Sequence, residues 1–179
     1  MVIGVDPSIN STGVCVWDGK ENTYFNICSK MTKKMKEFRH PRIKLVGYEK
    51  GDVKGKEYAE KERIKFNNIY SIISVLKEIF LEFKPEKIFM EGVSYGSVGS
   101  AALIDLAMLN ASIRMLCMEL GVAFEIVSPT ELKKFACANG GADKGVMVDA
   151  WKRLDPGGAV DAGLKVDDLA DAFFLAHYQ

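Results

Sequence analysis

Four carboxylates occupy positions that suit metal chemistry. Asp6 ends the first apolar run, and Glu91 interrupts the apolar segment KIFMEGV, where an unpaired charge is costly to bury. Asp168 and Asp171 are three residues apart in the last helical segment, so their side chains share one face of a helix. Carboxylate oxygens gathered in one pocket are the ligands that Mg²⁺ and Mn²⁺ prefer. The four acids therefore predict a site for hard divalent cations.

Each acid also has an explanation without chemistry. Asp6 fits a turn residue, and Glu91 fits a strand-edge glutamate that faces solvent. Asp168 fits a helix N-cap with Asp171 in the first turn, where the helix dipole favours negative charge. The metal site requires a fold that brings all four side chains together. No Ser/His/Asp or Cys/His arrangement in the sequence competes with it.

The elements that position these acids follow from the hydrophobic pattern. Short β-rich runs joined by tight polar turns predict three antiparallel strands at residues 2–6, 12–17 and 23–28. Two later strands, at 87–93 and 122–127, alternate with helices at about 57–83, 101–120, 130–138, 142–154 and 166–177. This order predicts one α/β domain over residues 1–179, with a five-stranded mixed sheet, its first three strands antiparallel, and helices on both faces.

Positive charge is concentrated in one insertion. Residues 30–65 hold 13 Lys or Arg against 6 Asp or Glu, a local excess of seven, although the whole chain has a formal net charge of zero. Such a segment can pair with phosphates, and a solvated, flexible insertion is the equal alternative. Within it, Lys33, Lys34 and Lys36 are the candidate DNA-binding residues.

Composition is that of an ordinary globular domain, with 48% hydrophobic and 27% charged residues. No apolar run approaches the roughly 20 residues of a membrane span, and no signal-peptide pattern opens the chain. We therefore expect a cytoplasmic protein without a membrane partner, acting in the host cytoplasm if the source is viral.

Four segments, taken in order, resemble one nuclease family. They are GVDPSINSTGV, FMEGVSYG, SPTELKKFACANGGADKGVM and KVDDLADAFFLAH. Together they are similar to RuvC-type Holliday junction resolvases, which belong to the RNase H and retroviral-integrase-like superfamily. The resemblance covers nearly the whole chain and implies an RNase H-like fold, with the insertion at about 30–65 as its main departure.

The resemblance implies roles for particular residues. Asp6, Glu91, Asp168 and Asp171 match the family's four metal-binding acids. Asp167 is an alternative to Asp168. Lys133 and Lys144 match two basic residues that contact the scissile phosphate, and Lys134 lies beside the first. The implied mechanism is hydrolysis with two Mg²⁺ ions, for which Mn²⁺ substitutes: one ion activates water and the other stabilises the leaving oxygen.

The resemblance also implies partners. The substrate would be branched DNA, foremost four-way junctions, with flaps and replication forks as alternatives. Tyr95, in the Gly/Ser loop after Glu91, is a candidate to stack on an unpaired base, or else a packed loop aromatic. We expect a homodimer through the apolar helix 101–120, because two symmetric cuts need two sites; burial of that helix in the monomer core is the alternative.

Two other classes of function remain as alternatives. The opening GVDPSINSTG also looks like the phosphate-binding turn of the sugar kinase/Hsp70 superfamily, but those ATP-binding proteins duplicate the fold and this chain has one copy. A module that binds branched DNA without cutting it would have no use for four clustered acids. Both are weaker than the nuclease interpretation.

Overall fold

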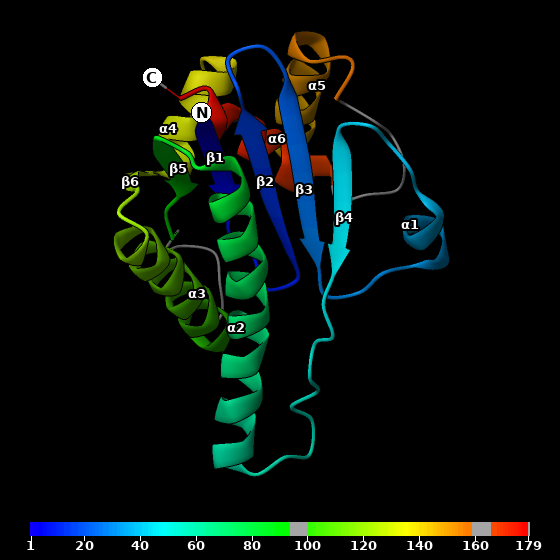
Figure 1. Ribbon diagram of the computed structural model, residues 1–179, viewed down its shortest axis with the longest axis vertical. Helices are drawn as coiled ribbons and strands as arrows, with labels where there is room; N and C mark the ends of the chain where they lie inside the picture. Colours follow the sequence, from blue (N-terminus) through cyan, green and yellow to red (C-terminus); the bar gives the residue numbers. More distant parts are fainter. Residues whose placement is uncertain (94–99, 159–165, 179) are drawn as a thin grey trace.

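A six-stranded mixed sheet forms the centre of the protein, which the computed structural model describes at residues 1–93, 100–158 and 166–178 (Figure 1). The strands lie in the order β4-β3-β2-β1-β5-β6, with bounds β1 Val2–Asp6, β2 Ser11–Trp17, β3 Asn22–Cys28, β4 Ile43–Gly47, β5 Lys87–Glu91 and β6 Ala123–Val127. The predicted antiparallel meander of β1, β2 and β3 is confirmed. The count of five is corrected to six, because β4 adds a parallel strand beside β3.

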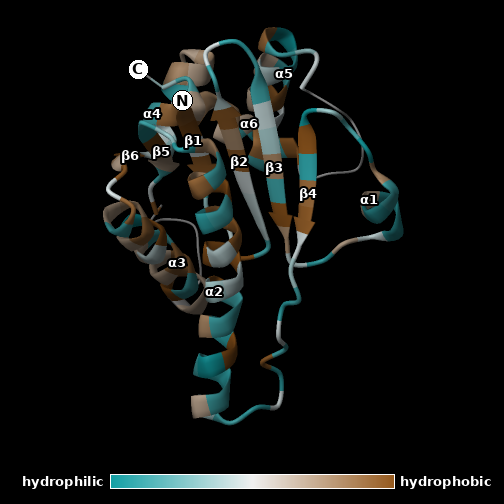
Figure 2. Cartoon of the chain, viewed as in Figure 1, coloured by the Kyte–Doolittle hydropathy of each residue, from teal (hydrophilic) through white to brown (hydrophobic). Residues whose placement is uncertain are grey.

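Helices cover both faces of the sheet, as predicted. On one face lie α2 (Tyr58–Phe83) and α3 (Ser100–Glu119). On the other lie α4 (Pro129–Cys137), α5 (Lys144–Leu154) and α6 (Val166–Ala176). Each face has its own apolar core, and hydrophobic colouring is concentrated in the strands between them, whereas the lower part of α2 is largely hydrophilic (Figure 2).

Alternation along β1 decides which core each residue enters. Ile3 and Val5 pack toward α2 and α3. Gly4 faces α6 instead, because successive side chains of a strand point to opposite faces. A Cβ atom at Gly4 would lie 2.1 Å from the backbone carbonyl oxygen of Ala172, so only glycine lets α6 lie this close to the sheet.

The insertion at 30–65 folds into two parts of different charge. Residues 30–44, which include the short helix α1 (Lys33–Glu37), carry seven Lys or Arg against one acid. Residues 49–65, an extended stretch and the start of α2, carry six against five. Neither α1 nor β4 was predicted. The positive charge is therefore concentrated around α1, beside β4 at the sheet edge opposite β6 (Figure 1).

One helix is longer and more apolar than we expected, since no apolar run was expected to approach the length of a membrane span. Ala101–Glu119 of α3 is long and apolar enough to cross a membrane by length and composition, and only a minor part of it is buried inside the protein. A single helix of this kind is weak evidence for a span, because the core helix of a globular protein can pass the same test. In α3, Leu109 and Ile113 are buried in the core, while Met115 and Met118 are exposed.

Candidate active site

Asp6 and Glu91 lie at the carboxyl ends of neighbouring strands. β1 and β5 are parallel, and the residues just before the two acids are register partners. Gly4 and Phe89, two residues before each acid, face α6. Because side chains alternate with a period of two, both acids point toward α6. Asp6 is buried and Glu91 is partly buried.

A second glycine brings the acids of α6 to this strand end. Gly13 of β2 is the register partner of Asp6, and a Cβ atom there would lie 2.0 Å from the backbone carbonyl oxygen of Asp168. The Asp168 side chain is buried, and Asp171 lies one turn later on the same helix. The four predicted acids therefore meet between the sheet and α6.

Sequence reasoning missed Gly4 and Gly13, although they determine how closely α6 approaches. Both belong to strands whose other face is filled by large apolar residues. The available signal was a glycine two residues before Asp6 in one strand and a second glycine in the next strand of the meander. A strand glycine often marks close approach by another backbone.

The clustered charges shift the protonation of these acids. Burial first, and then the negative charges of Glu91, Asp171 and Asp168, raise the pKa of Asp6 well above its usual range. Burial and the charge of Glu91 raise the pKa of Asp171 to about 7. Burial also raises the pKa of Glu91, against the opposing effects of its hydrogen bond with Asp6 and of nearby lysines. The cluster therefore holds protons that separated carboxylates would release.

Two predicted lysines lie at the rim of the acids. Lys133 of α4 and Lys144, the first residue of α5, both lower the pKa of Glu91 through their positive charge. The Lys144 ammonium donates a hydrogen bond to Asp167 Oδ2 at 2.5 Å. That bond is the main cause that raises the pKa of Lys144. Lys134, beside Lys133, is exposed.

The donor set fits a hard divalent cation in its chemistry. Across residues 1–93, 100–158 and 166–178, no three Asp, Glu, His or Cys side chains are positioned to hold one metal ion as they stand. The negative charges of the neighbouring acids nevertheless raise the pKa of Asp6 and of Asp171, so a cation would relieve repulsion that is already present. The four acids supply oxygen donors alone, which suits Mg²⁺ or Mn²⁺ better than softer ions.

The other predicted DNA-binding residues lie either away from the acids or outside the part of the chain that the structure describes. Lys33, Lys34 and Lys36 are exposed on α1, which lies beyond β4 at the edge of the sheet (Figure 1). Asp6 and Glu91, in contrast, lie at the ends of the central strands β1 and β5. Tyr95 lies outside the described residues. The lysines of α1 therefore lie well away from the acidic cluster.

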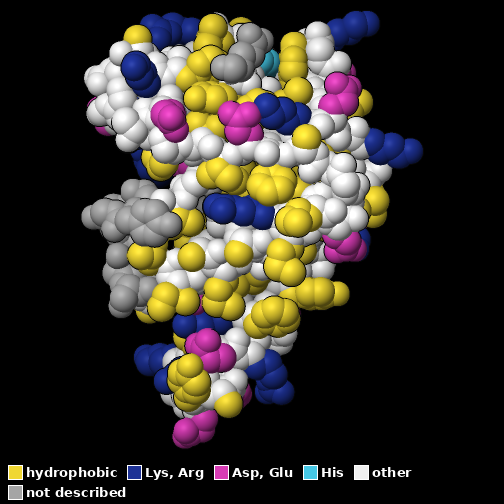
Figure 3. All heavy atoms as spheres, turned by 90° about the vertical axis from the view of Figure 1, so that its left-hand side faces the viewer, with side chains coloured by type: hydrophobic (Ala, Val, Ile, Leu, Met, Phe, Trp, Pro, Cys, Tyr) yellow, Lys and Arg dark blue, Asp and Glu magenta, His cyan; other side chains and the backbone are white. Residues whose placement is uncertain are grey.

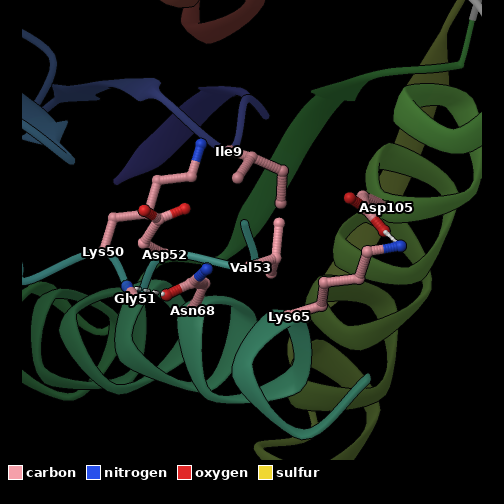
Figure 4. Close-up of a pocket in the computed structure, with 8 residues that line it drawn as sticks. All are labelled: Ile9, Lys50, Gly51, Asp52, Val53, Lys65, Asn68 and Asp105. Atoms are coloured by element: carbon pink, nitrogen blue, oxygen red, sulfur yellow. Dashed lines mark hydrogen bonds and ion pairs between the residues drawn. The ribbon is translucent and has the colours of Figure 1, made fainter. Parts of the chain in front are cut away.

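Residues of the insertion also form hydrogen bonds with the turn that follows Asp6. The Tyr48 hydroxyl donates to the Ile9 carbonyl, and Lys50 Nζ donates to Asn10 Oδ1 at 2.6 Å. Beside them is a cavity of about 250 Å³ (Figure 4) lined by Ile9, Lys50, Gly51, Asp52, Val53, Lys65, Asn68 and Asp105. Its two lysines and two aspartates balance in charge, so it offers phosphate no net attraction.

Comparisons with known proteins bear on the fold. No family model and no curated protein matches the chain. Among solved structures, the chain is similar to Thermus thermophilus RuvC in complex with a Holliday junction substrate, with a TM-score of 0.62 and 17% identity over 98% of this chain and 89% of that one. A second Thermus thermophilus RuvC structure has a TM-score of 0.57 and 20% identity over 98% and 90%. The chain therefore has the RNase H-like fold of RuvC, as the sequence resemblance implied.

Proposed function

We propose that this protein is a divalent-metal-dependent endonuclease that cuts branched DNA, with four-way junctions as its preferred substrate. The observation that carries the proposal is the cluster of Asp6, Glu91, Asp168 and Asp171 with two lysines at its rim. A protein of the same fold, RuvC, has been captured with a Holliday junction substrate. Fold alone does not define function, so the acids and lysines are the primary support.

The four carboxylates would hold Mg²⁺, with Mn²⁺ as a substitute. Two bound ions would activate a water molecule and stabilise the oxygen that leaves the cleaved phosphodiester. The raised pKa values of Asp6 and Asp171 mean that ion binding must displace protons. Apparent metal affinity should therefore increase with pH across the neutral range.

The lysines would act on the phosphate. Lys133 and Lys144 lie near Glu91, as the effects of their charges show, and an ammonium there can stabilise the negative charge that develops on the phosphate during cleavage. Neither ammonium is buried deeply, since Lys144 is exposed and Lys133 partly so. Both can therefore meet a DNA backbone that approaches from solvent.

We further propose a homodimer through α3. One side of this helix packs on the core, which includes Leu109 and Ile113, so the monomer leaves the opposite side open. Met115 is 70% exposed and Met118 73% exposed. Apolar side chains also gather across this side of the molecule (Figure 3). Such a patch favours a protein interface, and a twofold pair would match the two symmetric cuts of a four-way junction.

Cleavage of a panel of labelled DNA substrates tests the proposed function. A four-way junction, a replication fork, a flap and a linear duplex are incubated with the protein in Mg²⁺, in Mn²⁺ and in EDTA. We expect paired symmetric nicks in the junction with either metal and none in EDTA. Preferential cutting of flaps or forks would change the substrate, whereas binding without any cutting would favour a recognition module.

A further inference from the structure

Asp167 and Asp168 are adjacent in sequence but point to different partners. Consecutive residues of an α-helix are separated by about 100° around its axis. Asp168 is buried, and its charge acts on Asp6. Asp167 is partly exposed, at 28% of its side chain, and accepts the hydrogen bond from Lys144. The two acids of this pair are therefore suited to different tasks.

We propose that Asp167 is a positioning residue that holds the Lys144 ammonium at the rim of the acidic cluster, ready to meet the scissile phosphate. The inference rests on the proposed nuclease function. It assigns Asp167 a task other than metal binding, because its carboxylate is directed at an ammonium and Asp168 occupies the inward side of the helix.

Lys144 needs such a partner because its side chain is long and largely exposed. Its side chain is 71% exposed, and a long, exposed lysine loses considerable rotamer entropy when it is fixed in one place. The helix that carries it is well anchored, since Met147, Ala150 and Trp151 of α5 are buried against the core that α6 shares. The backbone of α5 thus fixes the Cα position of Lys144, and the hydrogen bond to Asp167 fixes the position of its ammonium group.

The position of Lys144 matters because it acts on more than one acid. Its charge lowers the pKa of both Glu91 and Asp171. An ammonium held there offsets part of the repulsion that phosphate would meet from the carboxylates. A neutral side chain at 167 would leave Lys144 free to extend into solvent, where its charge would be screened.

A double-mutant cycle tests the inference. Asp167→Asn, Lys144→Gln and the double variant are compared in single-turnover cleavage of a four-way junction, with Asp149→Asn, an exposed acid on α5, as the matched control. Loss of a charge-assisted hydrogen bond predicts a rate about tenfold lower for Asp167→Asn. The Mn²⁺ concentration for half-maximal cleavage should not change. Adding Asp167→Asn to Lys144→Gln should have no further effect, and Asp167→Glu should recover part of the rate.

Three results would overturn it. If the reductions in cleavage rate of the two single variants multiplied in the double variant, Asp167 would act independently of Lys144. A higher Mn²⁺ requirement for Asp167→Asn would make Asp167 a metal ligand. Faster cleavage by Asp167→Asn would mean that the ion pair restrains Lys144 from the phosphate.

A measurement without DNA separates this inference from the proposed function. The amines are acetylated with a limiting reagent, and the modification of each lysine is measured by mass spectrometry. We expect Lys144 to react severalfold faster in Asp167→Asn than in the unaltered protein, with Lys134 unchanged as an internal reference. If no DNA is cut but this change occurs, the contact stands and the nuclease proposal fails. An unchanged Lys144 contradicts the inference even if cleavage is observed.

Discussion

Replacing Gly13 with alanine should separate the acids without unfolding the protein. The added methyl would lie 2.0 Å from the Asp168 carbonyl oxygen, and ordinary contact begins at 3.4 Å. The beginning of α6 must therefore retreat by about 1.4 Å. Metal–ligand distances tolerate about 0.2 Å, and a misplacement of about 1 Å can cost about 100-fold in rate. We expect single-turnover cleavage of a four-way junction to fall by about that factor.

The same variant should remain folded and bind DNA. Overpacking costs about 1–3 kcal/mol of the free energy of unfolding and occasionally more. Because the overlap here is with backbone atoms, we expect at least the upper end of that range, which urea denaturation followed by circular dichroism would measure. Gly141→Ala is the control, because the nearest atom that a methyl there would meet among the described residues is Asn139 Oδ1, at 3.5 Å. A folded Gly13→Ala protein that cuts junctions as fast as the unaltered protein would refute the argument that close approach of α6 builds the site.

Three further perturbations follow from the same structure. The pKa of Asp171, about 7 in the folded protein, lies above its unfolded value of about 3.9, so the metal-free protein should lose stability as pH rises through this interval. Asp171→Asn should therefore raise the free energy of unfolding of the metal-free protein at pH 8, by at most about 4 kcal/mol, and change it little at pH 4. Equal stability of the variant and the unaltered protein at pH 8 would contradict this. Neutralising Lys33, Lys34 and Lys36 of α1 should weaken binding to all DNA sequences. It should also reduce the slope of log binding constant against log salt concentration by about 0.9 per lost phosphate contact. An unchanged dissociation constant would show that α1 is a solvated helix that does not bind DNA. Met115→Glu should yield monomers in sedimentation, unlike the control Val146→Glu, which also changes an exposed residue. A variant that remains a dimer would show that the interface lies elsewhere than at Met115.

Much of the fold was predictable because local patterns agreed with tertiary structure. The five predicted strands and five predicted helices all form, with ends displaced by only a few residues. Strand alternation and the apolar stripe of each helix identify burial directly. The elements that were missed, α1 and β4, lie in the charged insertion. There β4 buries only Ile43 fully, which gives too weak a pattern to recognise.

The site was predictable in its members but not in how they are arranged. Asp6 and Glu91 are recognisable because an acid in an apolar strand is costly to bury unless it is paired or binds a metal ion. The separate roles of Asp167 and Asp168 were not predictable, because a sequence does not fix the rotation of a helix on its sheet. That rotation depends on the contacts of α6 with Gly4 and Gly13. The partner of Lys144 depends on how α5 packs beside α6, which is also a tertiary property.

The effect of Glu91→Gln on junction DNA is the most direct test of the central claim. This change keeps the shape of the side chain and removes its charge from the cluster. Cleavage and binding of a labelled four-way junction are measured for both proteins in Mg²⁺. We predict that Glu91→Gln binds the junction at least as tightly as the unaltered protein but no longer cuts it. Full cleavage by Glu91→Gln at the same Mg²⁺ concentration would contradict the assignment of the site.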